Sequence, residues 1–118
     1  MNFEKLFING EWIDGASGTF IEVLDVGTKK VMARVPRGNE DDVNLAVASA
    51  LKAQETWQET SKEERIAYVQ KALDYLRAHQ DEITDIEISE LGQPRDWTHQ
   101  THVLRNFSRI ESYLEVAK

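Results

Sequence analysis

Two histidines and an aspartate are the side chains in this sequence that come nearest to a metal-binding pattern. His99 and His102 lie three positions apart, and Asp96 precedes His99 by the same spacing. On a helix these three side chains would share one face and could supply part of a metal site. The sequence shows no fourth ligand, and histidine pairs at this spacing often arise by chance. We therefore predict a polar, solvent-facing surface and no metal ligand in this chain.

Paired carboxylates are the next side chains that could take part in catalysis, since two of them can act as general acid and general base. They gather at Glu40–Asp42, Glu63–Glu64 and Asp81–Glu82. Each group lies where a helix is expected to begin, and negative charge there is explained by capping and by the helix dipole. We predict no catalytic role for these carboxylates.

The sequence also contains no recognisable motif for an activated nucleophile or a phosphate-binding loop. The chain contains no cysteine, which excludes a thiol nucleophile or a thiolate metal site within it. Ser17, Ser61 and Ser89 have no neighbouring base in a recognisable arrangement. The glycine-rich stretch Gly15–Gly18 lacks the G-x-G-x-x-G and P-loop spacings. The sequence therefore predicts no catalytic residue and no cofactor-binding residue in this chain.

The charge distribution bears on possible partners and location. The 118 residues carry a net charge of -7, and residues 1–39 contribute nothing to it because their five acidic and five basic side chains balance. An acidic surface repels phosphate backbones, so neither nucleic acid nor an anionic membrane is an expected partner. No apolar run is long enough to span a membrane, and the first residues lack a signal-peptide core. We expect a cytoplasmic protein.

The elements that would position these residues change type along the chain. Residues 1–38 are predicted to form strands, because Asn9-Gly10 between the β-prone runs Lys5–Ile8 and Glu11–Asp14 is a strong signal for a type I′ hairpin. Alternating runs at Thr19–Leu24 and Val31–Val35 predict two further strands.

Residues 39–118 have the helical period instead. Asn39 is the expected N-cap of a first helix, and Ser61 opens a second with the spacing of a capping box. His79-Gln80-Asp81 is a candidate break within the long apolar stripe of that second helix, and whether the helix is broken there depends on what it packs against. Gly92 followed by Pro94 ends the stripe. A last helix is expected from about Arg95 onward.

The predicted fold class is α+β, with a small N-terminal antiparallel hairpin and sheet followed by three to four amphipathic helices. We expect residues 1–118 to form a single unit, with the change from strands to helices at Arg37–Asn39 inside it. The apolar stripes are wide for so small a sheet, and the helical pattern still runs at Lys118. The chain is therefore expected to associate with itself through these faces, or to be part of something larger.

Six segments, taken in order, resemble the N-terminal part of the NAD(P)-dependent aldehyde dehydrogenase superfamily. The matching segments are Phe7–Trp12 (F-I-N-G-E-W), Val35-Pro36-Arg37, Asp42-Val43 with Ala46-Val47 and Ala50, Trp57, Glu64-Arg65, and Glu90-x-Gly92-x-Pro94. The sequence departs from the family pattern at Asp25–Lys30, which lacks the usual N-P-x-[ST]-G-E, and at Gln93, where lysine is common. We do not carry the family's structural cation site over to this chain.

The resemblance implies a fragment of the aldehyde dehydrogenase fold. The parent reaction would be oxidation of an aldehyde to a carboxylic acid with NAD or NADP, using a cysteine nucleophile and a glutamate base that lie far downstream in the family. This chain is therefore expected to bind no cofactor and to be inactive alone. In the family, the helix corresponding to Leu104–Leu114 borders the substrate entrance, so Phe107, Ile110 and Glu111 are the residues expected to face it. Core packing is the alternative for Phe107 and Ile110.

Two hypotheses follow for the chain as a whole. The first is a fragment of an aldehyde dehydrogenase, and the second is a stand-alone interaction module that forms oligomers and has no enzymatic activity. The first predicts loose self-association of uncovered apolar faces, and the second predicts a cooperative oligomer with a reproducible interface of at least roughly 1,000 Å².

Overall fold

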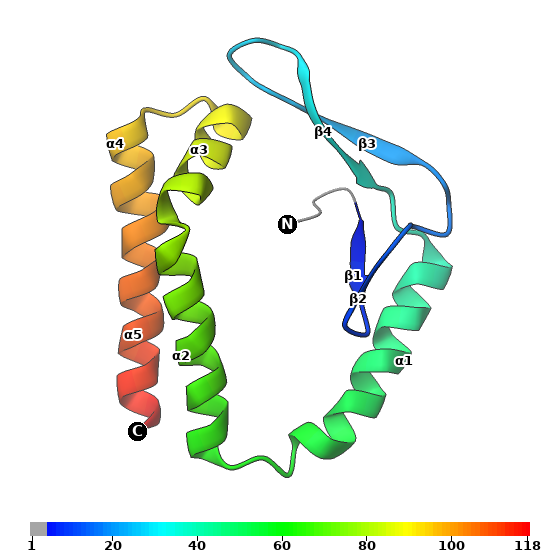
Figure 1. Cartoon of the computed structure of the whole chain (residues 1–118), viewed down its shortest axis with the longest axis vertical. Helices are drawn as coiled ribbons and strands as arrows, with labels where there is room; N and C mark the ends of the chain where they lie inside the picture. The colour runs from blue at the N-terminus through cyan, green and yellow to red at the C-terminus, as the bar shows by residue number, and fades with distance from the viewer. Residues whose placement is uncertain (1–4) are drawn as a thin grey trace. The chain divides into compact units, whose positions relative to one another are not determined.

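The computed structural model describes residues 5–118, in which two pairs of strands precede the helices (Figure 1). The strands are β1 (Leu6–Ile8), β2 (Glu11–Ile13), β3 (Phe20–Leu24) and β4 (Val31–Pro36). The helices are α1 (Glu40–Trp57), α2 (Lys62–Ala78), α3 (Gln80–Leu91), α4 (Arg95–Thr98), the π-helix η1 (His99–Leu104) and α5 (Arg105–Ala117). The predicted α+β class, with strands first and helices after, is confirmed.

The chain divides into two compact units, Met1–Glu59 and Thr60–Lys118. The division falls between α1 and α2, so the strands and the first helix belong to one unit and all later helices to the other. The change from strand to helix near residue 39 therefore lies inside the first unit, where the sequence pattern put it. That residues 1–118 act as a single unit stays a prediction.

Strands β1 and β2 form the predicted hairpin around Asn9 and Gly10. The two turn residues have φ values of 56° and 80°, as a type I′ turn requires. The strands pair antiparallel with Phe7 opposite Trp12, and these two rings lie 5.0 Å apart between centroids. The sequence prediction of this hairpin is confirmed.

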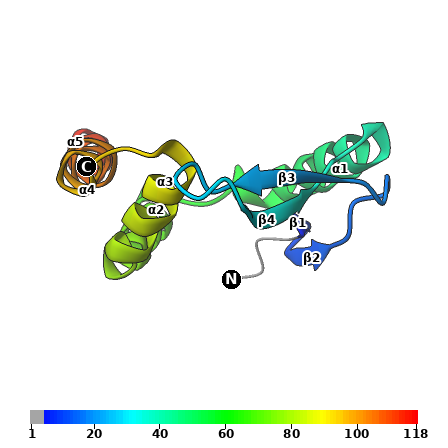
Figure 2. The same cartoon turned by 90° about the horizontal axis from the view of Figure 1, so that it is seen from above.

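Strands β3 and β4 form a second antiparallel pair, separate from the first (Figures 1 and 2). Ile21 lies opposite Val35 in its register. The connection is closed by Asp25, whose Oδ1 accepts a hydrogen bond from the Thr28 amide at 2.6 Å.

Helix α1 is fixed to the strand region through its first turn. Asn39 caps the helix, and its side chain accepts a hydrogen bond from the Asp42 amide at 3.1 Å. The Asp42 carboxylate completes the capping box by accepting from the Asn39 amide at 2.9 Å. The same carboxylate accepts from the amide of Ala16 at 3.0 Å, although only 5% of Asp42 is exposed. Asp42 therefore connects the β2–β3 turn to the helix, a role beyond the dipole effect that the sequence suggested.

In the second unit, the sequence pattern predicted the start of α2 and the end of α3. The Ser61 hydroxyl accepts from the Glu64 amide at 3.1 Å and so caps α2. The stripe breaks at His79, between α2 and α3, and α3 ends at Gly92, which has a φ of 69°. The glycine end is confirmed, and the break near His79, which the sequence left open, is present. None of the helices within residues 5–118 is long and apolar enough to cross a membrane.

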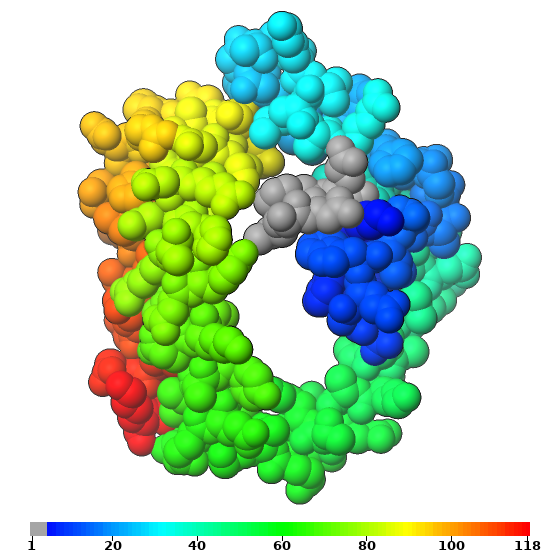
Figure 3. Space-filling model, in the orientation of Figure 1, coloured from blue at the N-terminus to red at the C-terminus, as the bar shows by residue number. Residues whose placement is uncertain are grey.

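The core of this unit lies between helices that are distant in sequence. Helices α2 and α5 run side by side, in green and red in Figures 1 and 3. The buried side chains are Leu73, Val103, Phe107 and Leu114, with Ile66, Ile83, Leu104 and Ile110 packed around them. Burial of these apolar side chains is the main stabilising contribution to the unit.

Candidate functional site

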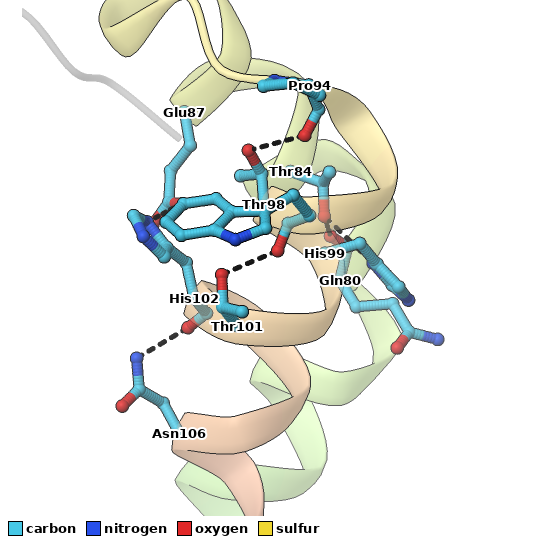
Figure 4. Close-up of polar contacts among 10 residues, drawn as sticks. Gln80, Thr84, Glu87, Pro94, Thr98, His99, Thr101, His102 and Asn106 are labelled. Carbon is cyan, nitrogen blue, oxygen red and sulfur yellow. Dashed lines mark hydrogen bonds and ion pairs between the residues drawn. The ribbon is translucent and has the colours of Figure 1, made fainter.

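Two of the polar side chains singled out in the sequence, His99 and His102, lie where α3 packs against the π-helix η1 (Figure 4). The hydroxyl of Thr84, which is fully buried, donates to the backbone carbonyl of Gln80 at 2.7 Å. Its oxygen lies 3.1 Å from Nδ1 of His99. Because a hydroxyl has a single proton, the Thr84 oxygen accepts here, and the His99 proton lies on Nδ1.

His102 makes a separate contact one turn further along. Its Nδ1 lies 3.0 Å from Oε2 of Glu87 on α3 (Figure 4). An ionised carboxylate only accepts, so His102 donates from Nδ1. The ring also packs edge to face with Trp97, with centroids 4.9 Å apart and planes at 62°. Glu87 and Trp97 therefore fix the orientation of this imidazole.

The two histidines do not converge on a common point. His99 is directed to Thr84 and His102 to Glu87, while Asp96 takes no part in either contact. Within residues 5–118 no three histidine, aspartate or glutamate side chains are arranged to hold a metal ion. The expected polar face is instead partly buried, with each histidine bound to a partner on α3.

The π-helix accounts for this arrangement. The amide of Arg105 donates to the carbonyl of Gln100, five residues earlier, where an α-helix would use the residue four earlier. Residues five apart lie about 140° apart around an α-helix, so Trp97 and His102 would point in different directions there. The wider turn of η1 brings both rings to one face. The sequence reasoning missed this feature and, with it, the roles of Glu87 and Thr84.

The structure gives each of the three residues expected at a substrate entrance a local partner. Phe107 is only 6% exposed and belongs to the core together with Leu73. Ile110 is half-buried beside that core. Glu111 forms an ion pair with Arg77 on α2. Core packing, the alternative for Phe107, therefore describes its place in this unit, and the role of all three at an entrance stays a prediction.

An apolar groove runs between α2 and α5 on the surface of the second unit. Its volume is about 550 Å³. Its lining residues are Lys62, Arg65, Ile66, Val69, Ile110, Tyr113, Leu114 and Ala117. Tyr113 is 75% exposed and Val69 45% exposed. Apolar side chains gain free energy when another protein surface covers them, so the groove is a candidate surface for protein packing.

The single glycine-rich turn does not fit a nucleotide phosphate. Gly15–Gly18 connects two strands instead of opening a helix. The Ala16 amide donates to Asp42, and the Gly18 amide donates to the Gly15 carbonyl at 3.1 Å. Backbone amides that already have acceptors cannot cradle a phosphate. This part of the structure therefore offers no site for a dinucleotide.

Comparison with known proteins decides the family. Residues 12–118 match the aldehyde dehydrogenase family. The chain belongs to the aldehyde dehydrogenase family. It is 37% identical over 111 residues to aldehyde dehydrogenase 1 of Tanacetum cinerariifolium, covering 86% of this chain and 22% of that protein. The resemblance inferred from the six sequence segments is thus confirmed.

Solved aldehyde dehydrogenases contain the same arrangement of elements. The chain superimposes on an aldehyde dehydrogenase from Bartonella henselae with a TM-score of 0.93 and 27% identity, covering 97% of this chain and 24% of that one. An NAD-dependent benzaldehyde dehydrogenase from Corynebacterium glutamicum gives a TM-score of 0.90 and 25% identity over 99% of this chain and 25% of that one. The chain is therefore a segment of the aldehyde dehydrogenase fold, and it spans about a fifth of the length of the curated relatives that it matches.

Proposed function

We propose that this chain serves as a packing segment of an NAD(P)-dependent aldehyde dehydrogenase. The parent reaction would be the oxidation of an aldehyde to a carboxylic acid, and NAD or NADP would accept the hydride. Membership of the family and the superposition on a quarter of a solved dehydrogenase support this assignment. The strands, helix ends and apolar faces would be this chain's contribution, while the reacting groups would come from other polypeptide.

The observation that carries the proposal is the uncovered α2–α5 groove. The groove has a volume of about 550 Å³, and two of its lining residues, Val69 and Tyr113, are 45% and 75% exposed. Burying apolar surface stabilises association by about 25 cal/mol per Å², so a protein surface that fills the groove gains free energy. In an intact dehydrogenase that surface would be other polypeptide of the enzyme. In a solution of this chain alone it would be a second copy.

The chemistry of the residues supports a non-catalytic role for this chain. The 118 residues contain no cysteine, so a thiol nucleophile of the parent reaction would lie elsewhere. The amides of the glycine-rich turn already have protein acceptors. We therefore expect neither turnover nor dinucleotide binding from this chain, and a cytoplasmic location remains part of the proposal.

Two measurements on the purified 118-residue chain test the proposal. Titration with NADH, followed by the fluorescence of the nicotinamide, should give no saturable change, and no NADH should form from NAD and an aldehyde. Sedimentation velocity should show association that increases with concentration. A Val69→Lys variant places a charge in the groove and should weaken that association, while Lys71→Gln on the same helix should not. Turnover, saturable NADH binding, or association unaffected by Val69→Lys would contradict the proposal.

A further inference from the structure

A second hollow lies beside the π-helix, away from the α2–α5 groove and lined by different residues. Its volume is about 400 Å³, within the range of small-molecule sites. Its lining residues are Glu87, Trp97, Thr101, His102, Arg105, Asn106 and Arg109. Two guanidinium groups and an indole thus face the same space, in a chain whose net charge is -7.

The positive charges of the two arginines are available to bind an anionic ligand. Arg105 and Arg109 lie four residues apart on α5, so they share one face of the helix. Within residues 5–118 no carboxylate forms an ion pair with either side chain, and Arg109 makes one long hydrogen bond, at 3.4 Å, to Asn106. Guanidinium groups bind carboxylates through paired, charge-assisted hydrogen bonds. The helix therefore presents two donors of the kind that recognise a planar anion.

The indole of Trp97 supplies an apolar surface in the same hollow. Half of this residue is exposed, and the edge-to-face contact with His102 fixes its orientation. Glu87, the acidic residue of the lining, accepts a hydrogen bond from His102 at 3.0 Å. The carboxylate of Glu87 is thus directed to the imidazole. An oriented aromatic face is a stacking surface for another planar ring.

We propose that this hollow binds an aryl carboxylate. The ring would stack on Trp97, and the carboxylate would accept hydrogen bonds from Arg105 and Arg109. The η1 turn contributes to this site because it brings His102 against Trp97, while Arg105 and Arg109 follow on α5 and line the same hollow. Inorganic phosphate would interact favourably with the arginines alone, and a neutral aromatic amide with the indole alone. Both should therefore bind more weakly than the aryl carboxylate.

Benzoate is the probe for this site, and the indole N–H signals in a nitrogen–proton NMR spectrum give the readout. At constant ionic strength, benzoate should shift the Trp97 signal saturably while those of Trp12 and Trp57 stay in place. The Arg105→Gln/Arg109→Gln double variant should raise the dissociation constant about tenfold or more, because it removes two charge-assisted donors. A Lys52→Gln/Lys71→Gln double variant removes the same charge elsewhere and should bind benzoate as the unchanged chain does.

Two further tests separate the parts of the proposal. A Trp97→Leu variant keeps both arginines and should lose affinity, measured through the line width of benzoate itself. Benzamide and inorganic phosphate should each shift the Trp97 signal less than benzoate does at equal concentration. The proposal is overturned if benzoate gives no saturable shift, if benzamide or phosphate binds as tightly, or if the arginine and lysine double variants behave alike.

Discussion

The carboxylate of Asp42 on helix α1 accepts a hydrogen bond from the backbone amide of Ala16, 26 residues earlier in the chain, at 3.0 Å. One side chain therefore both completes the capping box of α1 and holds the turn between β2 and β3. Asp42 is 5% exposed, so loss of its carboxylate would leave two backbone amides without their acceptor.

Replacement of Asp42 should therefore destabilise the first unit. We expect Asp42→Ala to lower the free energy of unfolding by about 1–3 kcal/mol, the usual cost of leaving buried donors unsatisfied. Urea denaturation measures this change, and hydrogen exchange at the Ala16 amide should accelerate. Asp41→Ala is the matched control, since Asp41 is exposed in the same helical turn and loses only a dipole interaction of about 0.3–1 kcal/mol. Equal effects of the two substitutions would rule out the role assigned to Asp42.

A side chain at Gly10 should destabilise the hairpin turn. The residue has a φ of 80°, and a Cβ atom there would meet no atom within 4 Å. The cost of Gly10→Ala is therefore backbone strain alone, about 1–2 kcal/mol. Gly27→Ala is the control, because Gly27 lacks a positive φ and its Cβ would only touch the Asp25 carboxylate at 3.5 Å. Thermal unfolding of both variants tests this, and a Gly10→Ala chain as stable as Gly27→Ala would contradict it.

Two aromatic residues of α5 should differ sharply in their effect on stability. Phe107 is 6% exposed and lies in the core, whereas Tyr113 is 75% exposed. Phe107→Ala should cost about 3–5 kcal/mol through lost burial and the cavity that remains. Tyr113→Ala should change stability by less than about 0.5 kcal/mol. Comparison of the two urea midpoints decides, and a mild Phe107→Ala effect would favour the entrance role over core packing.

Much of the backbone was predictable because its signals are local. Asn9-Gly10 determines a turn through positive φ, and Gly92 ends α3 for the same reason. Asn39 caps α1 through an amide only three residues away. Each of these effects depends on neighbours in sequence, and the sequence alone was enough.

The polar cluster depended on information that the sequence does not carry. No residue pattern marks the hydrogen bond from Arg105 to Gln100 that widens η1, so the α-helical spacing put Asp96, His99 and His102 on one face. The partners Thr84 and Glu87 come from another helix, 15 residues away in each case. These contacts depend on how α3 and η1 pack against each other in the folded chain. The hydrogen bond from the Ala16 amide to the Asp42 carboxylate was not predicted for the same reason.

Self-association of the 118-residue chain tests the central claim, that its apolar faces are packing surfaces, most directly. Light scattering and chemical denaturation should be recorded together over a hundredfold range of protein concentration. We predict that the average molar mass from light scattering rises with protein concentration. The midpoint of unfolding should move to a higher denaturant concentration, because association stabilises the folded chain by mass action. A chain that stays monomeric, with an unfolding midpoint independent of concentration, would contradict the account.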